Sequence, residues 1–237
     1  MFSNPNILGI LALGGSLATV SELRIRGVNQ ESIILLLINF IGLLFTNYRS
    51  GIFAFIAVIV LLYSYQLGGR GLFSITTVAG LFCVSLFFVL VVSPIHIPLN
   101  NRQYLWTAAY NVFLDQPVLG HGLGRSRAVI QSELPMFLKG GPGIDNAYLR
   151  MFVALGIIGG VSYIFAILSC VVTAARNATN PIQVDLSVFI TAFALIQIFV
   201  GYTFIGVFLP SLLIALPIGY HINSDKKSLL DITYSQS

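Results

Sequence analysis

The charged side chains of this chain gather in one stretch, residues 94–145. The chain carries only 12 Lys or Arg and 8 Asp or Glu among its 237 residues. The segments on either side of the stretch are almost wholly apolar, so we expect the protein to carry out its chemistry within it. Seven of the charged residues lie there: Arg102, Asp115, Arg125, Arg127, Glu133, Lys139 and Asp145.

Two residue types in this stretch suit work on a phosphorylated or hydroxylated substrate. Guanidinium groups present planar, paired N–H donors that fit phosphate oxygens. Arg102 is placed equally well to meet lipid headgroups and to grip a lipid-linked phosphate. Asp145 follows a glycine-rich segment and precedes an apolar run, as a helix N-cap does. A carboxylate there could also accept a proton from a sugar hydroxyl, so both roles stay open for Asp145.

Glycines alternate in the passage that follows Asp115. Gly120, Gly122 and Gly124 could let backbone N–H groups approach an anion closely, or they could serve a loop that needs positive φ angles. The passage lacks the strand–turn–helix context of a dinucleotide-binding loop. The histidines and carboxylates of the stretch lack the spacing of metal ligands, and we expect no metal and no cofactor.

The elements that position these residues are membrane helices. The chain is 57% hydrophobic and 8% charged, whereas a soluble domain has about a quarter of its residues charged. A spanning helix needs about 20 mostly apolar residues. We predict an all-α membrane protein, a single transmembrane domain over 1–237 with about seven transmembrane helices, or six if the last two runs form a broken hairpin. The apolar runs cover residues 7–20, 33–45, 52–65, 72–93, 147–172, 186–202 and 207–220.

The short loops predict the orientation, because Lys and Arg gather on the cytoplasmic side. With seven spans, the short loops of one side carry Arg49 alone, and residues 94–145 lie on that side. We therefore expect 94–145 to be an extracytoplasmic loop, facing the periplasm or the exterior, that carries the active site. The other side carries Arg24, Arg26, Arg70, Arg176, Lys226 and Lys227.

Residues 102–113 have the apolar spacing of a helix lying in the membrane interface. Leu105, Ala109 and Val112 fall on one side, with Trp106 and Tyr110 beside them, and both aromatic types favour the membrane–water boundary. Asp115 is expected to cap or end this helix. No ionisable residue falls in the middle of a span, which weakens a transporter interpretation. Asn39 is the clearest polar residue within a span, and we expect it to make an interhelical hydrogen bond.

Four passages, in this order, resemble the conserved region of the superfamily of O-antigen ligases and polymerases, which are membrane glycosyltransferases. The first is Thr46-Asn47-Tyr48-Arg49-Ser50-Gly51, which is similar to the family's Thr-x-Ser-Arg-Gly stretch. Tyr stands there in place of Ser, and a Ser precedes the Gly. The second is Arg102 with Trp106, which matches an Arg-x-x-x-Trp element.

The third passage, residues 117–124, matches the family's Pro-x-x-Gly-x-Gly-x-Gly turn. The fourth combines residues 145–149 with residues 155–159 and matches His-Asn-x-Tyr-Leu followed by Leu-Gly-x-x-Gly, with Asp145 in place of His. The similarity spans about residues 33–172. Each motif is weak alone, but the ordered set is fairly specific.

The resemblance implies a glycosyltransferase that polymerises oligosaccharide repeat units, carried on undecaprenyl diphosphate, into O-antigen or exopolysaccharide. Ligases of the family have His where this chain has Asp145, and polymerases vary there, so the substitution favours a polymerase. One alternative is an O-antigen ligase that joins polymer to lipid A core. Another is a non-enzymatic flippase or transporter fragment. Relatives usually have several more spans ahead of residues 46–51, so the chain is expected to be truncated or a C-terminal part.

The resemblance also implies roles for particular residues. Arg49 and Arg102 would clamp the diphosphate, and Asp145 would orient or deprotonate the acceptor hydroxyl. The expected partners are the lipid-linked oligosaccharide, membrane lipids and a chain-length regulator or flippase, with no nucleic acid. The expected location is the bacterial inner membrane. Further substrate contacts are expected from Arg125, Tyr148, Asn146, Trp106, Gly122 and Gly124.

Overall fold

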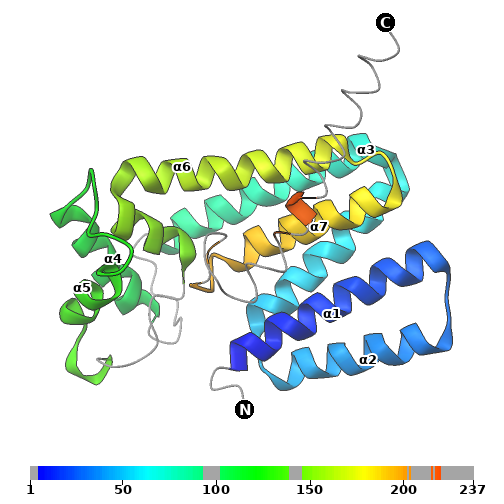
Figure 1. The fold of residues 1–237 in the computed structure, drawn as a ribbon, viewed down its shortest axis with the longest axis horizontal. Coiled ribbons are helices and arrows are strands. Elements are labelled where there is room, and N and C mark those ends of the chain that lie inside the picture. The colour runs from blue at the N-terminus through cyan, green and yellow to red at the C-terminus, as the bar shows by residue number, and fades with distance from the viewer. Residues whose placement is uncertain are drawn as a thin grey trace, which may run out of the picture. The chain divides into compact units, whose positions relative to one another are not determined.

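The computed structural model describes residues 5–92, 102–138, 146–201, 203, 215 and 217–219, and the side chains among them except those of residues 5–6, 81–92 and 102–103. Within these residues the chain is helical and has no strand, which confirms the all-α prediction for the part described (Figure 1). The helices are α1 (Pro5–Arg26), α2 (Gln30–Phe45), α3 (Arg49–Val92), α4 (Arg102–Asp115), α5 (Ser126–Glu133), the 3-10 helix η1 (Met136–Leu138), α6 (Ala147–Asn177) and α7 (Pro181–Ile196).

These helices form two compact units, which are described separately. Among the described residues, the first unit holds 5–78, 170–193, 215 and 217–219, and therefore α1, α2, α3 as far as Val78, the end of α6 and most of α7. The second unit holds the remainder of α3, then α4, α5, η1, residues 147–169 of α6 and the segment 194–203.

Among the residues that the structure describes, three segments are long and apolar enough to cross a membrane: Ile7–Arg26, Arg49–Gly80 and Ala147–Asn177. Two shorter apolar helices, Gln30–Phe45 and Pro181–Ile196, accompany them. Large apolar side chains stay exposed along α2, Ile38 and Phe45 among them, as lipid-facing residues do. The chain is therefore a helical membrane protein. The count of seven spans stays a prediction, and the apolar run at 207–220 lies largely outside the described residues.

Helix α3 reverses direction at Gly68 and Gly69. Gly69 has φ 59° and ψ −152°, a conformation that L side chains rarely adopt. The hydroxyls of Ser64 and Thr76 lie 2.8 Å apart although twelve residues separate them, a stretch that would span about 18 Å in a straight helix. The chain therefore turns back on itself here (Figure 1). Two helices result, 49–67 and 70–92, where the sequence predicts separate runs.

Small residues set the spacing between α1 and α2 in the first unit. Asn39 of α2 places its amide oxygen against Gly15 of α1, where a Cβ would force the Asn39 side chain to move. Its amide nitrogen donates to the carbonyl of Leu35 in its own helix, at 2.9 Å. The prediction that Asn39 makes an interhelical hydrogen bond is thus wrong, because its amide nitrogen donates within α2. The residue instead fills the space that a glycine leaves open.

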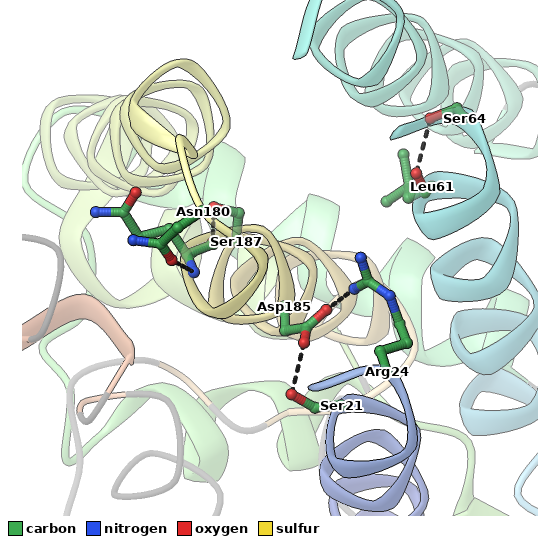
Figure 2. Close-up of polar contacts among 8 residues, drawn as sticks. Ser21, Arg24, Leu61, Ser64, Asn180, Asp185 and Ser187 are labelled. Carbon is green, nitrogen blue, oxygen red and sulfur yellow. Dashed lines mark hydrogen bonds and ion pairs between the residues drawn. The ribbon is translucent and has the colours of Figure 1, made fainter. Parts of the chain in front are cut away.

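A buried ion pair joins α1 to α7 in the same unit. The Asp185 carboxylate, only 6% exposed, accepts one hydrogen bond from Ser21 Oγ at 2.6 Å and another from the Arg24 guanidinium (Figure 2). Ser21 and Arg24 lie one turn apart on α1, so both reach the same carboxylate. Arg24 therefore has a role beyond that of a basic residue flanking a span, because it neutralises an acid at the start of α7.

Candidate functional site

The first turn of α6 carries the fourth sequence motif. Asn146 is its N-cap, since Asn146 Oδ1 accepts from the N–H of Leu149 at 3.0 Å and the Asn146 carbonyl accepts from the N–H of Arg150 at 3.1 Å. The cap predicted at Asp145 is therefore wrong by one residue. Asp145 itself lies outside the described residues. Because Asn146 caps the helix, the capping role proposed for Asp145 is not needed.

The start of α6 is held by hydrogen bonds to the segment 194–201. The N–H of Ala147 donates to the Gln197 carbonyl at 2.9 Å. The Tyr148 hydroxyl donates to the Ala194 carbonyl at 2.8 Å, and Arg150 Nη1 donates to the Gly201 carbonyl at 3.1 Å. The Tyr163 hydroxyl donates to Gln197 Oε1 at 2.8 Å, which fixes the Gln197 side chain as well. Three bonds therefore hold residues 147–150 against one short segment, and the bond from Tyr163 holds the Gln197 side chain of that segment.

Helix α6 is broken at Gly156, in the Leu-Gly-x-x-Gly passage. Gly156 has φ 66° and ψ −166°, so the helical pattern stops and resumes there. In an unbroken helix the N–H of Ile157 would donate to the carbonyl of Val153. In this chain Ile157 donates instead to the Pro117 carbonyl at 2.7 Å, and Val153 accepts from the N–H of His121 at 2.9 Å.

The glycine loop, residues 117–124, thus inserts into the hydrogen-bond ladder of α6. A third bond, from the N–H of Gly122 to the Ala154 carbonyl at 2.8 Å, completes the contact. Every N–H from Gly120 to Gly122 is used inside the protein, that of Gly120 by the Gln116 carbonyl. Gly120 and Gly122 have φ values of 68° and 85°. The loop therefore needs glycine for positive φ, and those three N–H groups are not available to an anion.

His121 ties the same loop to α4. Its Nε2 lies 2.8 Å from the carbonyl of Val112, in the last turn of α4. With Nε2 protonated, this is a hydrogen bond that satisfies one of the free carbonyls at a helix end. The backbone and side chain of His121 therefore connect α6 and α4 through a single residue.

Helices α4 and α5 build a small core against the first turns of α6 (Figure 1). Helix α4 ends at Asp115, as predicted. Its apolar side faces protein, and Trp106 is only 5% exposed, whereas Tyr110 is 53% exposed. Trp106 therefore packs against protein and does not face lipid, while the location of this helix in the membrane interface stays a prediction. The buried members of this core are Leu105, Trp106, Ala108, Ala109, Val112, Ile130, Leu134 and Val153.

The first motif forms a tight turn between α2 and α3. Asn47 has φ 49°, and the ring of Tyr48 is buried against Gly9 and Gly51, where no Cβ could fit. Arg49 follows at the first position of α3 with an exposed side chain. Tyr48, which replaces the family's Ser, anchors the turn and leaves the adjacent guanidinium facing outward.

The remaining predicted site residues are divided between the two units. Arg49 lies in the first unit, and Arg102, Arg125, Asn146 and Tyr148 lie in the second. The side chain of Arg102 is outside the described part, while that of Arg125 is exposed at the start of α5. The convergence of Arg49, Arg102 and Asp145 thus stays a prediction.

Two residues that take part in this arrangement were missed in the sequence. Gln197 and Tyr163 are buried and bonded to each other, yet both lie in apolar runs that carry no motif at those positions. The signal was present, because a glutamine in a membrane helix normally has a polar partner.

The chain is thus a helical membrane protein in which the glycine loop and the start of α6, which carry the third and fourth motifs, are bonded together. The sequence profile of the O-antigen ligase family matches residues 34–164 of this chain, more than half of its length. The chain belongs to this family, whose members are glycosyltransferase-like O-antigen ligases or polymerases that use lipid-linked saccharides. No curated protein sequence and no solved structure matches it.

Proposed function

We propose that the protein polymerises oligosaccharide repeat units carried on undecaprenyl diphosphate, at the extracytoplasmic face of a bacterial inner membrane. Family membership supports the use of a lipid-linked saccharide. The observation that carries the choice of site is the cap of α6. Asn146 caps the helix, so the cap does not require the neighbouring Asp145, and we assign to Asp145 the task of accepting a proton from a hydroxyl.

The reaction transfers a glycan from a diphosphate to a hydroxyl. The acceptor oxygen attacks the anomeric carbon of the donor, the bond from that carbon to the diphosphate oxygen breaks, and the hydroxyl proton passes to Asp145. The diphosphate leaves on the carrier lipid with the bonding electrons. The main task of the protein is therefore to align the attack and to stabilise the charge that develops on the leaving group.

Arg49 and Arg102 are proposed to stabilise that charge. A guanidinium remains charged at every relevant pH and pairs its donors with phosphate oxygens. The outward-facing side chain of Arg49 beside the anchored ring of Tyr48 supports its part in the clamp. Arg125, exposed at the start of α5, is proposed to contact sugar or phosphate.

The other predicted contacts keep narrower roles. The Tyr148 hydroxyl donates its hydrogen bond to the Ala194 carbonyl, so it can only accept a hydrogen bond from a substrate. Trp106 supports the second unit from inside, and Gly122 offers no free N–H. Of the predicted glycine contacts, Gly124 is the one left to approach a substrate, since it is exposed and no heavy atom lies near its Cβ position.

A ligase is the second candidate, because the matching family is described as O-antigen ligase. Purified protein in liposomes, supplied with undecaprenyl-diphosphate-linked repeat units alone, should make glycans of several repeats. A ligase would give no product until lipid A core is added. Absence of new glycosidic bonds with either mixture would contradict both enzymes.

A further inference from the structure

Two carboxamides are fully buried behind the first turn of α6, each with one atom that has no hydrogen-bond partner. Asn146 is 0% and Gln197 is 1% exposed. The oxygen of each is used, Asn146 Oδ1 by the N–H of Leu149 and Gln197 Oε1 by the hydroxyl of Tyr163. Asn146 Nδ2 and Gln197 Nε2 remain without an acceptor.

The two residues belong to the second unit, and their backbones meet there. The peptide group that links Asn146 to Ala147 donates its N–H to the Gln197 carbonyl at 2.9 Å. The backbones of the two residues are therefore in direct contact. Asp145, the proposed base, precedes Asn146 in the sequence.

Buried polar atoms without partners are rare, because such a group has lost its hydrogen bonds to water. The helix cap fixes the orientation of the Asn146 amide, so its unpartnered atom is a donor. The Gln197 amide can be turned about its axis, but one of its two polar atoms lacks a partner in either orientation. A hydroxyl suits both cases, since it accepts and donates hydrogen bonds.

We infer that Asn146 and Gln197 bind a hydroxyl group of the lipid-linked saccharide. This inference rests on the proposed function and deepens it: the arginines hold the diphosphate, and the two carboxamides hold the sugar beside Asp145. Tyr163 acts as a positioning residue, because it orients Gln197 without reaching the sugar. Both amide nitrogens are covered in this structure, so the sugar must displace chain or water to reach them.

The test compares the carrier with and without sugar. The full chain in detergent micelles is titrated with undecaprenyl diphosphate and with the same carrier bearing glucose, galactose or N-acetylglucosamine, and Kd is measured by native mass spectrometry. We expect at least one glycosylated carrier to bind about tenfold more tightly than the bare carrier, the size of effect that one or two hydrogen bonds give.

Two variants remove the amide donors while keeping the fold. Asn146→Ser retains a capping oxygen, and Gln197→Met retains the shape of the side chain. Both should bind bare carrier as the wild type does and should lose the preference for sugar. Asn180→Ser is the matched control, because Asn180 caps α7 in the same way, with its Oδ1 accepting from the N–H of Gln183 at 2.9 Å, and is exposed. Thermal unfolding of each variant checks that it is folded.

A preference that survives in either folded variant would overturn the inference, and would indicate that a bound water satisfies the amides. Equal binding of the bare and all three glycosylated carriers by the wild type would overturn it as well. Failure of the bare carrier to bind the wild type would contradict the diphosphate clamp, and with it the proposed function on which the inference rests.

Discussion

Gly120 and Gly156 lie against each other where the glycine loop crosses the break in α6. A Cβ on Gly120 would overlap the backbone nitrogen of Gly156, and a Cβ on Gly156 would overlap the carbonyl of Val118. Both residues also have positive φ angles, 68° and 66°. The two sequence motifs that contain these glycines thus form one interlocked structure, which positions Arg125 and the start of α6.

The first prediction concerns that contact. Gly156→Ala should lower the free energy of unfolding by about 1–3 kcal/mol or more, because alanine is strained at this φ and its methyl group overlaps the loop backbone. Thermal or denaturant unfolding in detergent measures the change. Gly71→Ala is the matched control, since Gly71 has ordinary φ and open space at its Cβ, and it should be neutral or slightly stabilising. Equal stability of the two variants would contradict the interlocked contact.

The second prediction separates the cap from the base at the start of α6. Asp145→Asn should abolish glycan polymerisation while leaving the unfolding temperature unchanged, because Asn146 supplies the cap. Asn146→Ala should instead cost about 1 kcal/mol of stability through loss of the cap. A parallel measurement of activity and thermal unfolding distinguishes them. Normal polymer from a folded Asp145→Asn protein would remove Asp145 from the chemistry.

The third prediction concerns Arg102. Arg102→Ala should reduce polymer formation by orders of magnitude, and Arg102→Lys should not restore it, because an ammonium group cannot reproduce the paired donors of a guanidinium. Arg127→Ala, at an exposed position of α5, serves as the control for loss of a positive charge. Polymer of normal length and yield from Arg102→Ala would exclude the residue from the clamp.

The fourth prediction concerns the ion pair between α1 and α7. Asp185→Ala leaves the Arg24 guanidinium largely buried without its acid, a change that costs about 3–5 kcal/mol in other proteins. The double variant Arg24→Ala/Asp185→Ala should be more stable than Asp185→Ala, because neither charge is then left alone. Unfolding of the three proteins tests this. A double variant less stable than Asp185→Ala would show that the charge is not the cause.

Local patterns predicted most of the helices. The separate apolar runs at residues 52–65 and 72–93 predict two helices, and the structure has them, divided at Gly68–Gly69. The helix predicted at 102–113 is α4, and its buried face carries the predicted Leu105, Ala109 and Val112. Helical periodicity is local in sequence, which is why it can be identified without knowledge of the fold.

The contacts between segments could not be predicted in the same way. The backbone hydrogen bonds of Pro117 and His121 with α6 depend on a break in that helix. A Leu-Gly-x-x-Gly pattern does not predict which loop occupies the break. Tryptophan is a residue type that favours the membrane interface, yet Trp106 is buried by packing against α5 and α6. The cap differs by one residue because Asp and Asn are adjacent and both cap helices well.

We propose that Arg49, Arg102 and Asp145 act on the same substrate. Paired cysteines at positions 49 and 145, in a Cys83→Ser/Cys170→Ser background and in lipid nanodiscs, test it with a short bifunctional thiol reagent. We predict efficient cross-linking of the 49/145 pair, and the two single-cysteine variants, at position 49 alone and at position 145 alone, are the controls that should give none. No cross-link between 49 and 145 in folded protein whose thiols react singly would contradict the shared site.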